Sequence, residues 1–310
     1  MSQSAAIFPG QGSQSVGMLE DLAAFSPLVR QTFDEASSVL GRDLWVLVAK
    51  GPAEELNQTR WTQPAMLAAD IAVWRVYRSL NGPMPQAMAG HSLGEYSALV
   101  ASGSMGFDDA VAVVHQRGSL MQAAVGEGEG AMAAILGLDD TEVEDCCRQA
   151  AETGIVVPAN YNSPGQLVIA GQSGAVELAV EYCRQAGARR AMLLPVSVPA
   201  HSPLMSPAVA PLQAALDAID FKTPVCPVLH NVDARQRAEA DTIRAALVEQ
   251  LIRPVPWTET IRELLDRNID RFLECGPGRV LSGLGRRIEK AVQWTALESP
   301  DAMRAAVRGD

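Results

Sequence analysis

The chain has 310 residues, of which 48% are hydrophobic and 20% are charged, and its formal net charge is −11. This length can bury the core of one large domain, or of one domain that carries a smaller insertion. The composition is that of an ordinary globular protein. The net negative charge argues against a surface for nucleic acid or for an anionic membrane.

The cysteines indicate reduced thiols. They show neither a Cys-x-x-Cys spacing nor a histidine pairing that would suggest zinc, and they lie at Cys146, Cys147, Cys183, Cys226 and Cys275. The N-terminus has no basic region followed by an apolar stretch, and no apolar run approaches the ~18 residues of a membrane span. We therefore expect a cytoplasmic protein with no membrane contact and no metal.

Short apolar runs alternate with longer helical stretches, which predicts an α/β fold with a mostly parallel sheet. Ala5–Phe8 is the first expected strand. The loop Pro9–Gln14 follows it at the carboxyl edge of the sheet, where ligands usually bind. Helices are expected from about Pro27 to Leu40 and from Gln63 to Leu80, ahead of a second apolar run, Ala87–Ala89.

The sequence Gly-His-Ser-Leu-Gly at residues 90–94 joins that apolar run to a segment of helical composition. This pattern is typical of a nucleophile elbow, in which flanking glycines allow a sharp turn that exposes a serine hydroxyl. Ser92 is therefore the candidate nucleophile. The amide of Leu93 would lie at a helix N-terminus, where it can donate to a developing oxyanion. The alternative is a glycine-flanked turn with a capping serine.

A further helix is expected from Asp108 to about Ala124, followed by an acidic, glycine-rich linker at residues 126–130. The next elements follow the order βαββαβ of a ferredoxin-like unit. They are the strands Ala131–Leu136, Ile155–Ala159, Gln166–Ala170 and Ala191–Val198 and the helices Asp140–Ala151 and Ser173–Gln185. We expect residues 128–198 to form a ferredoxin-like α+β subdomain, inserted into a large hydrolase-like catalytic domain of residues 1–127 and 199–310.

The alternation of strands and helices resumes after His201. Strands are expected at Val225–Leu229 and Arg271–Glu274. Residues 275–278 (Cys-Gly-Pro-Gly) are expected to turn into a final helix that runs through Arg286 and Arg287.

A nucleophilic serine needs a base, and the chain has four histidines. His91 adjoins Ser92, so its side chain is expected to point away from the serine toward the core. His115 lies inside a predicted helix. His201 and His230 each follow a predicted strand, where a sheet presents catalytic side chains. His201 is the candidate base and His230 the alternative.

Further motifs lie along the chain in a fixed order. They are FPGQGSQ at 8–14, NQT at 57–59 with TQPA at 62–65, GHSLGEY at 90–96, QRG at 116–118, NYNSPGQ at 160–166, VPAHS at 198–202 and ECGPG at 274–278. With these motifs the chain resembles the malonyl-CoA:acyl carrier protein transacylases, an acyltransferase family of fatty acid and polyketide synthesis. The resemblance covers nearly the whole chain.

The resemblance implies a nucleophile at Ser92, a base at His201 and an arginine, Arg117, that pairs with the free carboxylate of a malonyl group. A guanidinium suits that role because it binds a carboxylate through two hydrogen bonds. It also implies that the backbone amide of Gln11 completes an oxyanion hole beside the amide of Leu93.

The resemblance further implies that a backbone carbonyl, here matched to Gln250, orients the base. Hydrolase triads use an Asp or Glu for this purpose, so no triad acid is expected. Asn162 is expected to line the site, with a turn-forming asparagine as the alternative. The implied substrate is malonyl-CoA and the implied partner is an acidic acyl carrier protein. No bound cofactor is expected, and the chain is expected to be a monomer.

Docking of an acidic carrier on an acidic chain requires a local basic patch. Arg286 and Arg287 are the candidates, and a solvated helix face is the alternative. Other functions remain open at this stage: a trans-acting acyltransferase of a polyketide synthase, the malonyl transferase of a malonate decarboxylase, a serine esterase, or a non-catalytic interaction protein.

Overall fold

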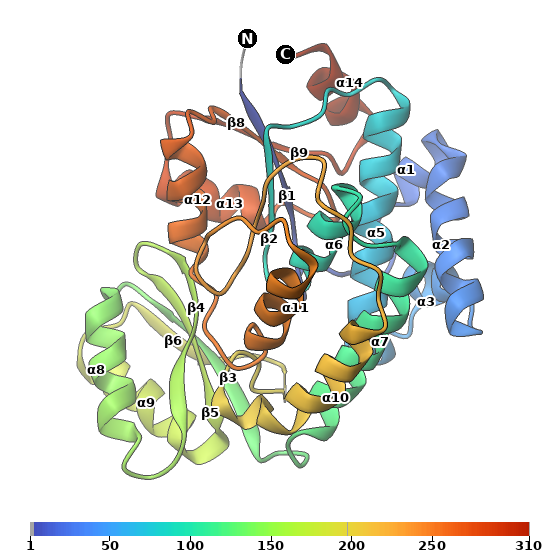
Figure 1. Cartoon of the computed structure of the whole chain (residues 1–310). Helices are drawn as coiled ribbons and strands as arrows, with labels where there is room; N and C mark the ends of the chain where they lie inside the picture. The colour runs from blue at the N-terminus through green and yellow to red at the C-terminus, as the bar shows by residue number, and fades with distance from the viewer. Residues whose placement is uncertain (1–2, 197, 310) are drawn as a thin grey trace.

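The computed structural model describes residues 3–196 and 198–309 (Figure 1). Within them a five-stranded parallel sheet has the strand order β7-β2-β1-β8-β9. Its strands are β1 (Ser4–Phe8), β2 (Ala87–Gly90), β7 (Val228–Leu229), β8 (Arg271–Glu274) and β9 (Gln293–Ala296). The carboxyl ends of β1 and β2 therefore lie next to each other, which brings the loop after β1 beside the elbow after β2.

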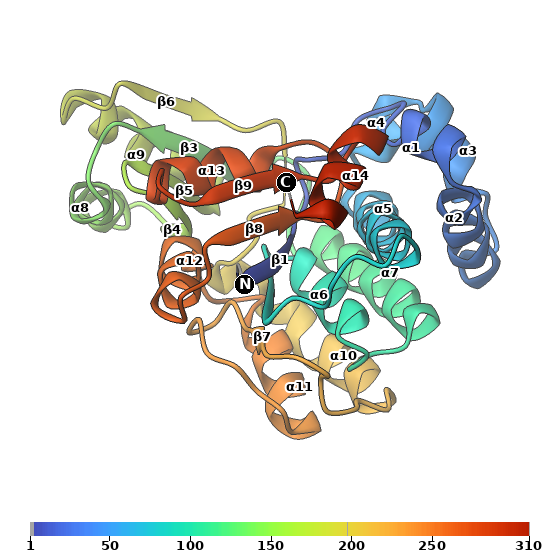
Figure 2. The ribbon, with the colours of Figure 1, turned by 90° about the horizontal axis from the view of Figure 1, so that it is seen from above.

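Alternate residues of β1 enter two different cores, because successive side chains of a strand point to opposite faces. Ala6 and Phe8 pack with one set of helices, and Ala5 and Ile7 pack with another. The first set includes α2 (Pro27–Leu40), α5 (Thr59–Ser79), α6 (Gly94–Ala101) and α7 (Phe107–Ala123), and the second includes α12 (Trp257–Asp266) and α13 (Val280–Ile288). Figure 2 shows the sheet between these two layers.

The other helices of this part of the chain contribute side chains to the same core as the first set (Figure 1). They are α1 (Glu20–Phe25), α3 (Leu44–Lys50), α4 (Ala53–Leu56), η1 (Pro203–Met205), α10 (Ser206–Asp217), α11 (Ala240–Glu249) and α14 (Pro300–Arg308). None of the helices in the described ranges combines the length and apolar character that crossing a bilayer requires.

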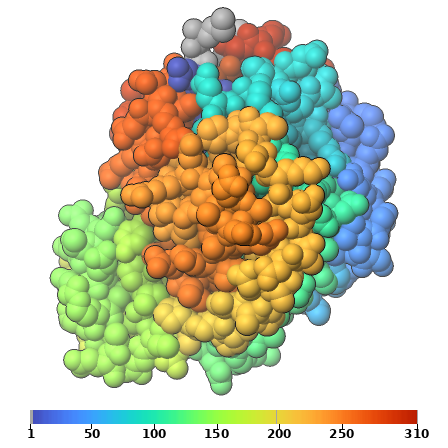
Figure 3. Space-filling view, in the orientation of Figure 1, coloured from blue at the N-terminus to red at the C-terminus, as the bar shows by residue number. Residues whose placement is uncertain are grey.

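A second, antiparallel sheet has the strand order β4-β5-β3-β6 and lies beside the first (Figure 1). Its residues form the green region at the lower left of the space-filling view (Figure 3). Its elements are β3 (Gly130–Leu136), α8 (Asp140–Ala150), β4 (Val156–Ser163), β5 (Gln166–Gln172), α9 (Ser173–Gln185) and β6 (Arg190–Leu193). The order βαββαβ with this pairing is ferredoxin-like, so the predicted α/β fold class with its inserted subdomain is confirmed.

The inserted unit has a core of its own, in which α8 and α9 cover one face of the antiparallel sheet. This separate core supports our proposal that the chain divides into residues 1–127 with 199–310 and residues 128–198.

Several predicted elements were wrong in extent. The helix through Arg286 and Arg287 is not the final one, because β9 and α14 follow it. The strand expected at 191–198 ends at Leu193, and the strand expected at 225–229 is reduced to Val228–Leu229. Leu194 and Val196 leave the sheet and line a cavity instead. An apolar run marks burial, and burial is available in a cavity wall as well as in a strand.

Candidate active site

The elbow between β2 and α6 places Ser92 at a positive φ of 51°. L-residues rarely adopt this conformation, which costs of the order of 1–3 kcal/mol. Close backbone contacts hold the turn. A Cβ atom at Gly94 would lie 2.0 Å from the Phe8 carbonyl oxygen, and one at Gly90 would lie 1.9 Å from the Gly94 carbonyl carbon. Only glycine fits at these two positions, which explains both glycines of the motif.

Asn231 lies two residues after β7, the strand next to β2, and its side chain hydrogen-bonds to the backbone of the elbow. Its side-chain Oδ1 accepts a hydrogen bond from the Ser92 amide at 2.7 Å, and its Nδ2 donates to the Gly90 carbonyl at 2.7 Å. Asn231 was not predicted from the sequence as a residue of the site. The signal that could have found it is its position at the carboxyl end of a strand.

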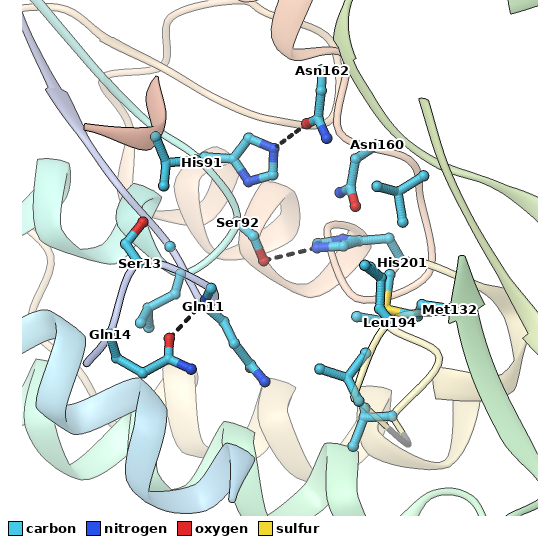
Figure 4. Close-up of a pocket in the computed structure, with 18 of the residues that line it drawn as sticks. Gln11, Ser13, Gln14, His91, Ser92, Met132, Asn160, Asn162, Leu194 and His201 are labelled. Atoms are coloured by element: carbon cyan, nitrogen blue, oxygen red, sulfur yellow. Dashed lines mark hydrogen bonds between the residues drawn. The ribbon is translucent and has the colours of Figure 1, made fainter. Parts of the chain in front are cut away.

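Ser92 and His201 are in hydrogen-bond contact, with 2.8 Å between Ser92 Oγ and His201 Nε2 (Figure 4). The other ring nitrogen, Nδ1, lies 2.8 Å from the carbonyl oxygen of Gln250. A carbonyl only accepts hydrogen bonds, so the proton is on Nδ1 and Nε2 is free to accept from the serine hydroxyl. The arrangement is that of a nucleophile with its base, and no carboxylate is needed to set the tautomer.

Burial lowers the pKa of His201 to about 3, and the guanidinium of Arg117 adds to the effect. Both causes disfavour the imidazolium. The imidazole is therefore neutral at neutral pH, which is the form that can take a proton from Ser92.

Arg117 extends from α7 and is only 1% exposed. Its Nη2 atom lies 2.8 Å from Gln250 Oε1 and 3.4 Å from Ser92 Oγ, and its guanidinium lies 5.5 Å from the ring centroid of Tyr96. Among the residues that the structure describes, no carboxylate comes within 4.0 Å of this guanidinium. The buried guanidinium beside Ser92 thus has no direct anionic partner. An anionic group of a ligand could form an ion pair with it.

A cavity of about 500 Å³ opens above Ser92, between the two units of the chain (Figure 4). The large unit contributes Ser92, His201, Arg117 and part of α13. The inserted unit contributes both apolar and amide side chains: Met132, Asn160, Asn162, Val168 and Leu194. The mixture of an apolar wall with a few convergent polar groups is typical of a ligand site.

The position of His91 differs from the sequence expectation. Its ring lines the cavity and its Nε2 lies 2.8 Å from Asn162 Oδ1 (Figure 4), so the prediction that it points away toward the core was wrong. The opposite wall of the cavity offers this amide partner, which a local argument from the elbow could not include. Asn162 thus lies at the cavity, as expected from the sequence.

The loop after β1 lies against the elbow. A Cβ atom at Gly10 would be 2.4 Å from the His91 carbonyl oxygen and 3.7 Å from the Leu93 amide nitrogen. Gln11 and Leu93 both line the cavity. Gln14 fixes the loop, because its Oε1 accepts from the Gly12 amide at 2.7 Å and its Nε2 donates to Asn57 at 2.8 Å. The structure therefore brings the two expected oxyanion donors to one wall.

The other candidate histidines lie elsewhere. His230 is fully buried behind the elbow, with its Nδ1 at 2.7 Å from Glu95 Oε1. His115 stacks against Trp61, with 5.0 Å between ring centroids. Neither is among the residues that line the cavity.

Arg286 and Arg287 are exposed on α13, whose inner face lines the cavity through Leu281 and Leu284. Arg287 donates a hydrogen bond to the side chain of Gln166, which is itself a cavity residue. Arg286 donates to the carbonyl of Trp294 at 3.2 Å. Arg287 therefore lies beside a residue of the cavity, whereas Arg286 contacts β9.

The sequence of the chain matches known proteins over nearly its whole length. The model of the acyl transferase domain matches residues 6–297. The chain belongs to the acyl transferase family. This acyl transferase is 53% identical to the malonyl CoA-acyl carrier protein transacylase of Escherichia coli (strain K12) over 307 residues, 99% of each chain. It is 44% identical to the protein of the same name from Bacillus subtilis (strain 168), over 99% of this chain and 97% of the relative.

Solved structures give the same relationship. The malonyl CoA-acyl carrier protein transacylase from Coxiella burnetii superposes with a TM-score of 0.98 at 48% identity, covering 99% of this chain and 98% of that one. A malonyl-transacylase solved in complex with a type II PKS acyl-carrier protein gives 0.98 at 51% identity, with all of both chains covered.

The depressed pKa of His201 predicts an unusual pH dependence for the reactivity of Ser92. A histidine base with an ordinary pKa would be half protonated, and so half active, near pH 6.5. Because the pKa of His201 is lowered to about 3, His201 stays neutral and active at pH values well below 6.5. The rate of Ser92 labelling by a fluorophosphonate should therefore be nearly flat from about pH 8 to about pH 5. In Arg117→Met the acid limb should move upward, because one cause of the depression is removed. A wild-type midpoint near pH 6.5 would contradict the assignment.

Proposed function

We propose that this acyl transferase moves malonyl groups from malonyl-CoA to the phosphopantetheine thiol of an acyl carrier protein and so supplies fatty acid synthesis. The observation that carries the proposal is the buried guanidinium of Arg117, 3.4 Å from the hydroxyl of Ser92 and without a carboxylate partner. An acyl group that ends in a carboxylate would pair with it. The names of the E. coli and B. subtilis relatives support the same substrate and carrier.

The first half-reaction loads the enzyme. Ser92 Oγ attacks the thioester carbonyl while His201 Nε2 takes its proton, and the amides of Leu93 and Gln11 bind the oxyanion. Collapse of the tetrahedral intermediate breaks the carbon–sulfur bond. The imidazolium returns its proton to the leaving sulfur, and a malonyl-serine ester remains with its carboxylate on Arg117.

The second half-reaction unloads it. The thiol of the carrier's phosphopantetheine arm attacks the ester carbonyl, with His201 again accepting the proton. The proton then passes to Ser92 Oγ as the ester breaks. Malonyl-carrier is released with the serine and the imidazole in their starting forms, so neither a metal nor a redox cofactor takes part.

The same chemistry would serve polyketide synthesis, with a different carrier. The observation that favours this second candidate is the 51% identity to the malonyl-transacylase solved with a type II PKS acyl-carrier protein.

The five cysteines, all buried and free, support a reducing compartment and hence the cytoplasm as the place of action.

We propose Arg286 and Arg287 as part of the docking surface for the carrier. The phosphopantetheine arm must enter the cavity from outside, and α13 exposes both guanidinium groups while its inner face lines the cavity. A positive patch on a chain of net charge −11 would attract an acidic carrier locally.

Incubation with malonyl-CoA is expected to add the mass of one malonyl group, because Ser92 is the nucleophile that His201 activates. Intact-mass measurement followed by peptide mapping should locate the adduct on Ser92. Ser92→Ala should abolish it, and addition of a purified carrier should remove it from the wild type. An adduct on another residue would refute the proposed mechanism.

Arg117→Ala should lower kcat/KM for malonyl-CoA roughly a hundredfold, because a charge-assisted contact is lost. This corresponds to a loss of transition-state stabilisation on the order of 2–3 kcal/mol. Acylation by acetyl-CoA should fall much less, because acetyl has no carboxylate. The measurement is the ratio of Ser92 acylation rates from the two thioesters. If the ratio equals that of the wild type, Arg117 does not bind the carboxylate.

Arg286→Glu combined with Arg287→Glu should raise the KM for the carrier roughly tenfold at low salt and weaken its salt dependence. Acylation of Ser92 by malonyl-CoA should stay normal. The matched control is Arg148→Glu with Arg184→Glu, an equal charge change on exposed residues of α8 and α9. Equal carrier kinetics in the two double variants would exclude this surface.

A further inference from the structure

Glu95 is a fully buried carboxylate that the reaction described above does not use. It lies in the first turn of α6, three positions after the nucleophile. Its Oε1 lies 2.7 Å from His230 Nδ1, and its Oε2 accepts from Gln250 Nε2 at 2.7 Å and from the Asn231 amide at 2.9 Å. A buried carboxylate with this many donors is held in a single orientation.

His230 does not neutralise this carboxylate. Its Nε2 is buried and has no hydrogen-bond partner in the described part of the chain. An imidazolium carries a proton on both nitrogens and would need an acceptor there. The ring is therefore neutral, with its proton on Nδ1 and donated to Glu95. The pair keeps a net charge of −1.

The carboxylate determines which way the Gln250 amide faces. Gln250 Nε2 donates to Glu95 Oε2 and, at 3.1 Å, to the Ser92 carbonyl, so both of its hydrogens have acceptors. Its Oε1 is then left to accept from Arg117 Nη2 at 2.8 Å. A flipped amide would place an NH₂ group against the guanidinium and an oxygen against the carboxylate, and both contacts are repulsive.

Glu95 and Arg117 are thus opposite charges joined through one amide. Glu95 is one of the groups that raise the pKa of Arg117, against the lowering caused by burial. Because the two side chains do not touch, the counter-charge occupies none of the hydrogen-bond donors of the guanidinium. The donors that Gln250 and Ser92 do not engage stay available to a ligand carboxylate.

We propose that Glu95 is a positioning residue for recognition of the acyl carboxylate: it acts through the Gln250 side chain to orient the guanidinium of Arg117. This inference rests on the proposed function. It predicts a separation of two properties. His201 is held by the backbone carbonyl of Gln250, so the reactivity of Ser92 should survive changes that loosen the side-chain amide.

The test is Glu95→Gln, which keeps the shape of the side chain and removes its charge. The Gln250 amide loses a charge-assisted acceptor and can flip, and the uncompensated guanidinium is displaced. The ratio of Ser92 acylation rates from malonyl-CoA and acetyl-CoA should fall roughly fivefold to tenfold, while fluorophosphonate labelling stays within about twofold of wild type. An unchanged or increased ratio would overturn the inference. Loss of labelling would also overturn it, because Glu95 would then support the elbow itself.

A double-mutant cycle tests the route through Gln250. Gln250→Met removes the amide and keeps the backbone carbonyl, so it should lower the ratio on its own. Glu95→Gln should then lower it no further, because coupled residues are non-additive. If the two substitutions lowered the ratio independently and additively, Glu95 would not act through Gln250, and the inference would be overturned.

The control is Asp70→Asn, which changes another fully buried acid that contacts α6, through a 2.7 Å hydrogen bond from Ser97. Burial raises the pKa of Asp70 well above its usual value, which favours the neutral form that Asn imitates. Its substitution should leave the ratio at the wild-type value. A wild-type enzyme with no preference for malonyl-CoA would refute the proposed function and this inference together, whereas a wild-type preference that survives Glu95→Gln would refute the inference alone.

Discussion

The hydrogen bonds of Gln250 hold His201, Ser92 and Arg117 in one arrangement. The backbone carbonyl fixes the tautomer of His201, and the side-chain amide bridges the Ser92 carbonyl and Arg117. Each of these contacts joins residues more than 45 positions apart in the chain, with separations of 49, 133 and 158. The site therefore exists only when the whole large unit is folded, and a local change at the end of α11 would reach all three groups.

The inserted unit is fixed to this framework through the segment that follows Gln250. The Val255 amide donates to the Ala159 carbonyl at 2.8 Å, and the Tyr161 amide donates to the Val255 carbonyl at 2.9 Å. Thr258 adds a hydrogen bond to the Tyr161 carbonyl at 3.1 Å. A strand of the inserted unit is thus joined by backbone contacts to the stretch of chain that also orients the base. Asn162, next to Tyr161 in this strand, is thereby held opposite His91.

Local signals in the sequence were sufficient for much of this arrangement. The glycines of the elbow, the loop after β1 and the order of elements in the inserted unit each follow from short-range sterics and periodicity, and the predicted fold class was confirmed. Position alone favoured His201 over His230 only slightly, because both follow predicted strands, and the family motif strengthened the choice. The predicted positions of Ser92, His201, Gln250 and Arg117 come together in space, while their catalytic roles remain predictions.

The missed features depend on contacts between distant segments. The partners of Asn231 and Glu95 come from other strands and helices, so the sequence around each residue does not identify those partners. The partner of His91 belongs to the inserted unit. The edge strand β9 has four residues, of which only Trp294 is buried, and such a segment carries neither an apolar run nor an alternation.

The orientation of His201 by a neutral carbonyl, in a buried place next to a guanidinium, has a consequence for the direction of the reaction. An imidazolium formed there is a strong acid, and the carbonyl cannot stabilise it as a carboxylate would. It gives its proton quickly to whichever atom leaves, the sulfur of a thiol or the oxygen of the serine. In the proposed mechanism neither half-reaction would end on a stable imidazolium, so the exchange would run in either direction and its net flux would follow the supply of the two thioesters.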